Sequence, residues 1–181
     1  CALDEHVVSN TCVPCAAGTT NVAGDSASGS DTSCDVTLCA IDEFVSSNSC
    51  VSCAPGTTND AGDDASGSDT MCDAVICSTD EFVSSNACVS CPAGTTNAAG
   101  DDASGSDTTC DVTTCGVNQF VSTNACVSCP AGTTNAAGDD ASGSDTNCDA
   151  VICSTDEFVS ANACVSCPAG TTNAAGDDAS G

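Results

Sequence analysis

Short runs of β-prone residues alternate with longer polar segments along the whole chain. Residues 82–84 and 87–90 combine Phe, Val and Cys with Ser, and the Ser85-Asn86 pair between them has turn chemistry, so a small β-hairpin is predicted there. Pro92-Ala93-Gly94 ends the hairpin, and residues 95–107 are rich in Gly, Asp, Ser, Thr and Ala, which predicts an irregular loop. No segment shows helical periodicity of useful length.

The same pattern returns every 38 residues without an insertion, and each unit has the form C-x10-C-x2-C-x18-C-x4. Fixed-period similarity predicts a tandem array in which each repeat contacts only its neighbours. We therefore expect small, disulfide-rich, mostly β or irregular repeats, stacked into an extended rod that continues beyond both ends of this sequence. The predicted repeats, numbered 1 to 5, are residues 1–38, 39–76, 77–114, 115–152 and the partial repeat 153–181.

The composition cannot supply a conventional hydrophobic core. Leu, Ile, Val and Phe together number 26 of 181 residues, and the formal charge is −26 because the chain has no Lys or Arg. The missing cations argue against binding to nucleic acid or to an anionic membrane surface. No apolar run is long enough for direct membrane insertion. Charged partners are therefore expected to be cations or basic protein surfaces.

The 19 cysteines are predicted to form disulfides rather than zinc sites. Cys12, Cys15, Cys34 and Cys39 have spacing acceptable for zinc, but Cys1 would lie outside that pattern. Small units with little core are stapled by disulfides in oxidising compartments. Each bridge over a loop of 11 or 19 residues is worth about 3 kcal/mol in the chain-entropy account, which can replace the missing core.

The four cysteines of a repeat can pair in three ways. Nested pairing would close the CxxC motif on itself, a strained ring found mainly in redox sites. Crossed pairing joins the first cysteine with the third and the second with the fourth, whereas consecutive pairing joins the first with the second and the third with the fourth. The spacing alone disfavours the nested arrangement and leaves the other two open.

The string CxxCPAGT, in which 18 residues separate the second Cys from the next Cys of the repeat, resembles the cysteine-rich modules of tumour necrosis factor receptors and ephrin-receptor-like modules. In those modules the second Cys of CxxC pairs forward across a loop of this size. The resemblance therefore implies consecutive pairing: Cys1–Cys12, Cys15–Cys34, Cys39–Cys50, Cys53–Cys72, Cys77–Cys88, Cys91–Cys110, Cys115–Cys126, Cys129–Cys148 and Cys153–Cys164.

Tandem units of the form SNACVSCPAGTTNAAGDDASGSDT also resemble the cysteine-rich surface proteins of ciliates, the immobilisation-antigen family. That resemblance covers essentially the whole chain. It implies a secreted surface antigen that coats the cell and has no catalytic activity.

His6 is the only histidine and stands where the other repeats carry Phe, so it is interpreted as a changed aromatic position rather than a general base. The aromatic column is expected to pack over a cystine or to wedge against the neighbouring repeat. Its members are Phe44, Phe82, Phe120 and Phe158.

The acidic loop is the best candidate for binding, since carboxylates near Gly turns suit Ca²⁺. The alternative is a solvated acidic face that keeps the array soluble. The Ca²⁺ candidates are Asp63, Asp64, Asp69, Asp101, Asp102, Asp107, Asp139, Asp140 and Asp145.

The chain has no N-x-S/T sequon, so ordinary N-glycosylation is not expected. O-linked glycans are possible on the repeated Ser-Gly-Ser-Asp-Thr segment and on the Thr-Thr pairs, against the alternative of a bare polar loop. The pairs are Thr19, Thr20, Thr57, Thr58, Thr95, Thr96, Thr133, Thr134, Thr171 and Thr172.

These patterns together predict a non-enzymatic extracellular structural protein, a disulfide-stapled array that forms a surface coat or filament with copies of itself. The alternative is a Ca²⁺-dependent adhesin or a receptor-stalk binding module that uses the acidic loops.

Overall fold

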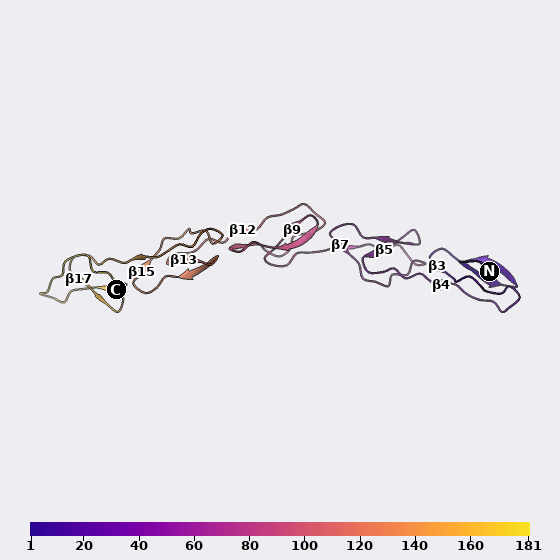
Figure 1. Ribbon diagram of the computed structural model, residues 1–181, viewed down its shortest axis with the longest axis horizontal. Coiled ribbons are helices and arrows are strands. Elements are labelled where there is room, and N and C mark those ends of the chain that lie inside the picture. Colours follow the sequence, from indigo (N-terminus) through magenta and orange to yellow (C-terminus); the bar gives the residue numbers. More distant parts are fainter. The chain divides into compact units, whose positions relative to one another are not determined.

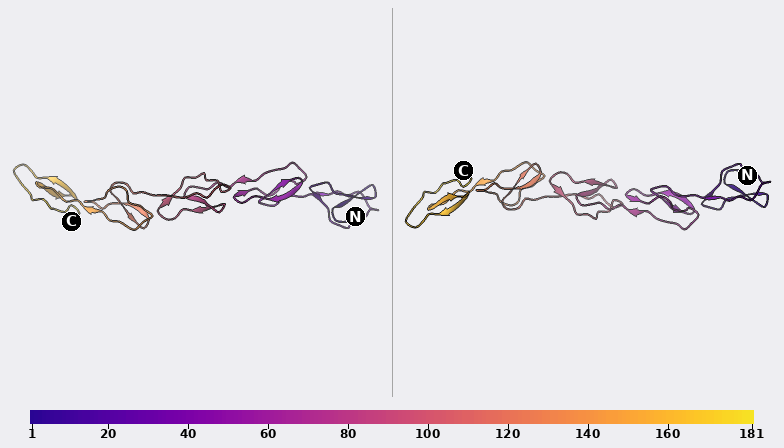
Figure 2. Two further views of the ribbon diagram at one scale, coloured as in Figure 1. Left: turned by 90° about the horizontal axis from the view of Figure 1, so that it is seen from above. Right: turned by 90° about the horizontal axis from the view of Figure 1, so that it is seen from below.

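The computed structural model describes residues 1–181 and contains 18 β-strands and no helix. Short strands are joined by irregular loops (Figure 1), and the two further views likewise show strands and loops without helices (Figure 2). Equivalent strands recur every 38 residues, as the first residues of β1, β5 and β9 (Glu5, Glu43 and Glu81) show. The prediction of small disulfide-rich β and irregular repeats without helices is confirmed.

Each repeat opens with two strands of four residues that form a two-stranded sheet. These strands are β1 (Glu5–Val8) and β2 (Thr11–Pro14), β5 (Glu43–Ser46) and β6 (Ser49–Ser52), β9 (Glu81–Ser84) and β10 (Ala87–Ser90), β13 (Gln119–Ser122) and β14 (Ala125–Ser128), and β17 (Glu157–Ser160) and β18 (Ala163–Ser166).

A second antiparallel pair of two residues a strand follows in repeats 1 to 4 and closes the long loop of each repeat. These strands are β3 (Thr19–Thr20) and β4 (Asp35–Val36), β7 (Thr57–Thr58) and β8 (Asp73–Ala74), β11 (Thr95–Thr96) and β12 (Asp111–Val112), and β15 (Thr133–Thr134) and β16 (Asp149–Ala150).

The hairpin turn lies at the Ser-Asn pair predicted from the sequence. Ser47 and Asn48, between β5 and β6, have φ angles of +51° and +59°. Two consecutive positive φ angles match the twist of the flanking strands, and Asn tolerates this conformation better than most residues. The Asn48 side-chain amide also donates to the Ala65 carbonyl oxygen at 3.0 Å, which attaches the turn to the long loop.

The chain contains nine disulfides, and each of them joins two consecutive cysteines of the same repeat. The first kind spans 11 residues and ties the start of a repeat to its hairpin, as Cys39–Cys50 does. The second kind spans 19 residues and closes the long loop, as Cys53–Cys72 does. The full set is Cys1–Cys12, Cys15–Cys34, Cys39–Cys50, Cys53–Cys72, Cys77–Cys88, Cys91–Cys110, Cys115–Cys126, Cys129–Cys148 and Cys153–Cys164.

The core of a repeat contains few side chains. In repeat 4 it consists of Val121 from β13, Cys115 and Ala141, with the half-buried Cys126 packed against them. Cys115 and Cys126 are bridged, so the core is one Val, one cystine and one Ala. A cluster this small buries too little apolar surface to offset the chain entropy lost on folding, which explains why the repeat needs covalent bridges.

The chain divides into two compact units. The junctions between repeats 1 and 2 and between repeats 2 and 3 lie in the first unit, and the two later junctions lie in the second. The first unit comprises Cys1–Ser78, Val83–Val89 and Gly100–Thr108, and the second comprises Thr79–Phe82, Ser90–Ala99 and Thr109–Gly181.

Candidate functional site

The long acidic loop crosses the edge of its own hairpin. In repeat 2 the Thr70 backbone N–H donates to the Val45 carbonyl at 3.0 Å, and the Val45 N–H donates back to the Thr70 hydroxyl oxygen at 2.9 Å. Thr70 therefore lies beside β5 much as a residue of a third strand would. This contact brings the loop carboxylates close to the hairpin.

Asp63 is the carboxylate that holds Thr70 in place. Its Oδ2 accepts from the Thr70 hydroxyl at 2.5 Å and from the Asn59 side-chain amide at 2.8 Å. Both bonds favour the charged form, and the Thr70 bond, followed by the Asn59 bond, lowers the pKa of the Asp63 carboxyl below its ordinary value. The Asp63 carbonyl oxygen accepts from the Cys39 N–H at 2.9 Å, so this residue links three parts of the repeat.

The other two acidic positions of the loop have different partners. Asp64 Oδ1 accepts from the Ser66 N–H at 2.8 Å and from the Ser66 hydroxyl at 2.6 Å, which closes a local turn. Asp69 Oδ1 accepts from the Ser47 N–H at 2.9 Å, in the hairpin turn. Each carboxylate therefore stabilises a separate part of the loop.

The Ca²⁺ candidates of repeats 3 and 4 have the same kinds of hydrogen-bond partner as their equivalents in repeat 2. Asp101 and Asp139 accept from Thr108 and Thr146 as Asp63 does from Thr70. The remaining candidates repeat the bonds of Asp64 and Asp69, in the pairs Asp102 with Ser104, Asp140 with Ser142, Asp107 with Ser85 and Asp145 with Thr123.

Two groups of three potential metal ligands have their ligand atoms within 4.8 Å of one another, and neither contains a Ca²⁺ candidate. One group is His6 with Cys15 and Cys34, and the other is Glu5 with Cys1 and Cys12. Both cysteine pairs are disulfides, whose sulfur atoms are not thiolate ligands. The structure thus brings the loop carboxylates to hydrogen-bond donors rather than to one another.

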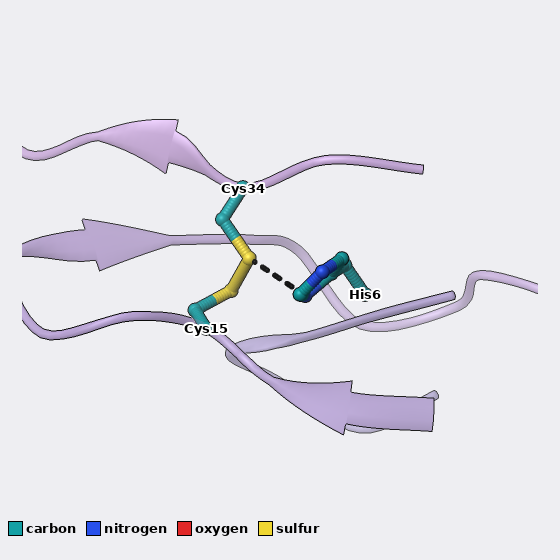
Figure 3. A group of neighbouring side chains, drawn as sticks. All are labelled: His6, Cys15 and Cys34. Atoms are coloured by element: carbon teal, nitrogen blue, oxygen red, sulfur yellow. Dashed lines mark hydrogen bonds between the residues drawn. A yellow bond between two sulfur atoms is a disulfide. The ribbon is translucent and has the colours of Figure 1, made fainter. Parts of the chain in front are cut away.

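His6 lies over the long-loop disulfide of its own repeat. Its ring points toward the bridge (Figure 3), and Nδ1 is 3.3 Å from Cys34 Sγ. A disulfide sulfur carries no proton to abstract, so this contact is packing with a weak polar component rather than an acid–base pair. The geometry agrees with the interpretation of His6 as an aromatic-column position that covers a cystine.

The phenylalanines occupy the same register position as His6. Phe44 faces Val51 across the hairpin just as His6 faces Val13. Phe44, Phe82 and Phe120 are half-buried, and Phe158 is 37 % exposed. In the hairpins of repeats 1 to 4 the fully buried side chain is the neighbouring Val, as the 0 % exposure of Val45 shows, so Phe is not the main core residue.

The junction between repeats is made by a glycine and an alanine. Gly56 of repeat 2 lies against Ala103 of repeat 3, so closely that a Cβ on Gly56 would be 2.3 Å from the Ala103 carbonyl oxygen. Gly56 also has φ of +78°, which disfavours any other residue. The contact recurs for Gly18 with Ala65, Gly94 with Ala141 and Gly132 with Ala179.

Backbone hydrogen bonds complete the junction. The Val75 N–H donates to the Gly56 carbonyl, and the Val75 carbonyl accepts from the Ala103 N–H, both at 2.9 Å. Val75 is therefore hydrogen-bonded to repeat 2 through Gly56 and to repeat 3 through Ala103. An antiparallel bridge between Ile76 and Asp102 extends the contact.

Nine of the ten hydroxyl groups in the Thr-Thr pairs proposed as O-glycan sites donate hydrogen bonds within the fold. Thr57 Oγ1 donates to the Ala54 carbonyl at 2.8 Å, and Thr58 Oγ1 donates to Asp42 Oδ1 at 2.6 Å. A glycosidic bond would replace the hydroxyl hydrogen and remove each donor. Equivalent bonds are made by Thr19, Thr20, Thr95, Thr96, Thr133, Thr134 and Thr171.

Sequence reasoning missed the Gly–Ala junction and the buried Val column. The signal available was identity between repeats, since the equivalents of Gly56, Ala103 and Val45 never change. Many loop positions are equally invariant, so identity alone could not single out these three.

Comparisons of the chain with models of protein families, with curated proteins and with solved structures found no match. No helix capable of crossing a membrane is present, and no pocket is found. The disulfide-rich tandem repeats are consistent with an extracellular, non-catalytic protein, and nine bridges indicate an oxidising environment.

Proposed function

We propose that this chain is a non-enzymatic extracellular structural protein, whose repeat array forms part of a surface coat or filament. The observation that carries the proposal is the small core of a repeat, which in repeat 4 is one Val, one cystine and one Ala. Such a repeat depends on its bridges for stability, and bridges of this number persist where thiols are not kept reduced.

The side chains of the best candidate site also support a structural role. The loop carboxylates accept hydrogen bonds from Thr, Asn, Ser and backbone donors of the same repeat, as Asp63 does from Asn59 and Thr70. These carboxylates therefore stabilise the folded conformation of the loop. The resemblance to ciliate surface proteins supports the same role, with further copies of the chain as its partners.

Localisation and cysteine oxidation in the native cells test this proposal. An antibody against the repeat should stain intact, non-permeabilised cells, with an antibody against a cytosolic protein as the negative control. Protein isolated in the presence of an alkylating reagent should carry no label on the cysteines of repeats 1 to 4. Staining only after permeabilisation, or alkylation of these cysteines, would contradict the proposal.

A further inference from the structure

The disulfides define a covalent route along the chain that is much shorter than the polypeptide. In repeat 2 the bridges Cys39–Cys50 and Cys53–Cys72 close consecutive loops that neither overlap nor cross. A force pulling on the two ends of the repeat therefore passes through the S–S bonds and leaves both loops unloaded. Only the steps from Cys50 to Cys53 and from Cys72 to Cys77 carry the force as ordinary backbone.

We propose that the array acts as a tension-bearing tether whose length under load is limited by its disulfides, an inference that rests on the proposed extracellular structural role. An extended chain spans at most about 3.6 Å per residue, so the eight unbridged steps of repeat 2 reach about 29 Å. The bridges add their Cα–Cα distances of 5.3 and 5.8 Å. The repeat reaches about 40 Å, against roughly 140 Å for the same residues without bridges.

The Val and Ala side chains of the core lie inside the unloaded loops, and only its cystine carries the force. Val45 is in the loop closed by Cys39–Cys50, and Ala65 is in the loop closed by Cys53–Cys72. Tension along the covalent route therefore does not pull directly on the chain segments that contain these residues. The core of the repeat should remain in place at forces that straighten the connecting segments.

The loaded connector between repeats is held by a small number of backbone bonds. Val75 donates to Gly56 and accepts from Ala103, and these bonds lie in the segment between Cys72 and Cys77. A few backbone hydrogen bonds open at a low free-energy cost and form again when the load is removed. The expected response is a short, reversible extension that stops where the bridges become taut.

Single-molecule force spectroscopy of the 181-residue chain between two handles tests the tether. In the oxidised chain each full repeat should extend to no more than about 40 Å, and thiol reductant should add roughly 100 Å per full repeat. An oxidised chain that already extends to nearly its full polypeptide length would overturn the proposal.

Paired variants of repeat 2 test the route itself. Cys39→Ser with Cys50→Ser should lengthen the oxidised chain by about 35 Å, and Cys53→Ser with Cys72→Ser should lengthen it by about 60 Å. These increments depend on covalent length, so they hold even if the altered repeat is unfolded. Under crossed pairing either double variant would lose both bridges and gain about 100 Å, which would contradict the consecutive route.

The two proposals fail in different ways. Alkylated cysteines or an intracellular location in native cells would remove the extracellular role, whatever the purified chain does under force. A long extension of the oxidised purified chain would remove the tether and leave the extracellular role intact.

Discussion

Gly132 and Gly170 occupy the same position in successive repeats, with φ angles of +80° and +83°, but their surroundings differ. In the 181-residue chain a Cβ on Gly132 would lie 2.2 Å from the Ala179 carbonyl oxygen, whereas one on Gly170 would meet nothing within 4 Å. Alanine at either position carries the cost of a left-handed backbone, about 1–2 kcal/mol. A comparison of Gly132→Ala with Gly170→Ala therefore separates the effect of the clash at the junction from the effect of the backbone strain, which both substitutions share.

Gly132→Ala should loosen the junction between repeats 4 and 5. Overpacking against a fixed backbone costs about 1–3 kcal/mol beyond the strain, so the Ala179 N–H, which donates to Val151 at 2.9 Å, should exchange with solvent roughly tenfold faster or more. Hydrogen exchange measured by NMR checks this. The control Gly170→Ala should leave exchange at Ala179 unchanged, and equal effects of the two substitutions would contradict the junction.

At the scale of elements, a single threonine joins the long loop to the hairpin. The Thr70 hydroxyl accepts from the Val45 N–H and donates to the Asp63 carboxylate. The negative charge of Asp63 thus orients the hydroxyl that pairs with β5. Thr32 repeats this arrangement with Asp25, whose pKa is also lowered, first by the Thr32 bond.

Acid should release this attachment. The folded-state pKa of Asp63 lies below the ordinary 3.8, so its stabilising contribution is fully present above that value and is lost as the pH falls through the folded pKa. Protection of the Val45 N–H should therefore weaken below about pH 4. NMR titration of the Asp63 carboxyl, with hydrogen exchange at Val45, checks both changes.

Substitutions identify the carboxylate responsible. Asp63→Asn should reduce the protection of the Val45 N–H against hydrogen exchange at neutral pH. It should also make the loss of this protection in acid smaller than in the parent chain. Asp60→Asn removes a nearby exposed charge and should leave the profile as in the parent chain. Identical acid profiles for the two variants would show that Asp63 does not hold Thr70.

At the scale of the whole molecule, the extended rod stays a prediction from the sequence. Identical units that contact only their neighbours form a helical or straight array when each junction has the same geometry. A Gly–Ala contact recurs at all four junctions. The formal charge of −26 should also oppose close lateral packing, so bundling should need divalent cations or a glycan layer.

Small-angle scattering at moderate salt measures the shape in solution. A rod-like array should give a radius of gyration well above the ~16 Å expected for a compact domain of this length. Reduction of the disulfides provides the comparison, since it should convert the curve to that of a flexible chain. A radius near the compact value would refute the array.

The hairpin and its turn could be predicted from the sequence because both depend on adjacent residues. Ser85-Asn86 lies between β9 and β10 as expected, since a two-residue turn is selected by local conformational preference. Disulfide use could also be predicted from composition, because 19 cysteines with so little apolar surface favour covalent bridges.

The choice of core residue could not be predicted, because both faces of the hairpin carry apolar side chains. Phe44 and Val45 are adjacent, so they point to opposite faces, and a period of two fits either face equally well. Only the folded loop, which in repeat 4 packs Ala141 in one cluster with Val121, decides that Val is buried.

The role of the acidic loop was likewise decided by tertiary structure. By composition the repeated aspartates suit a solvated surface or Ca²⁺, because the sequence does not reveal which donor each carboxylate meets. Folding places Thr70 and Asn59 at Asp63, Ser66 at Asp64 and Ser47 at Asp69. The sequence thus determined that each repeat is stapled and acidic, whereas long-range contacts determined that the acids fasten the loop and that a glycine joins one repeat to the next.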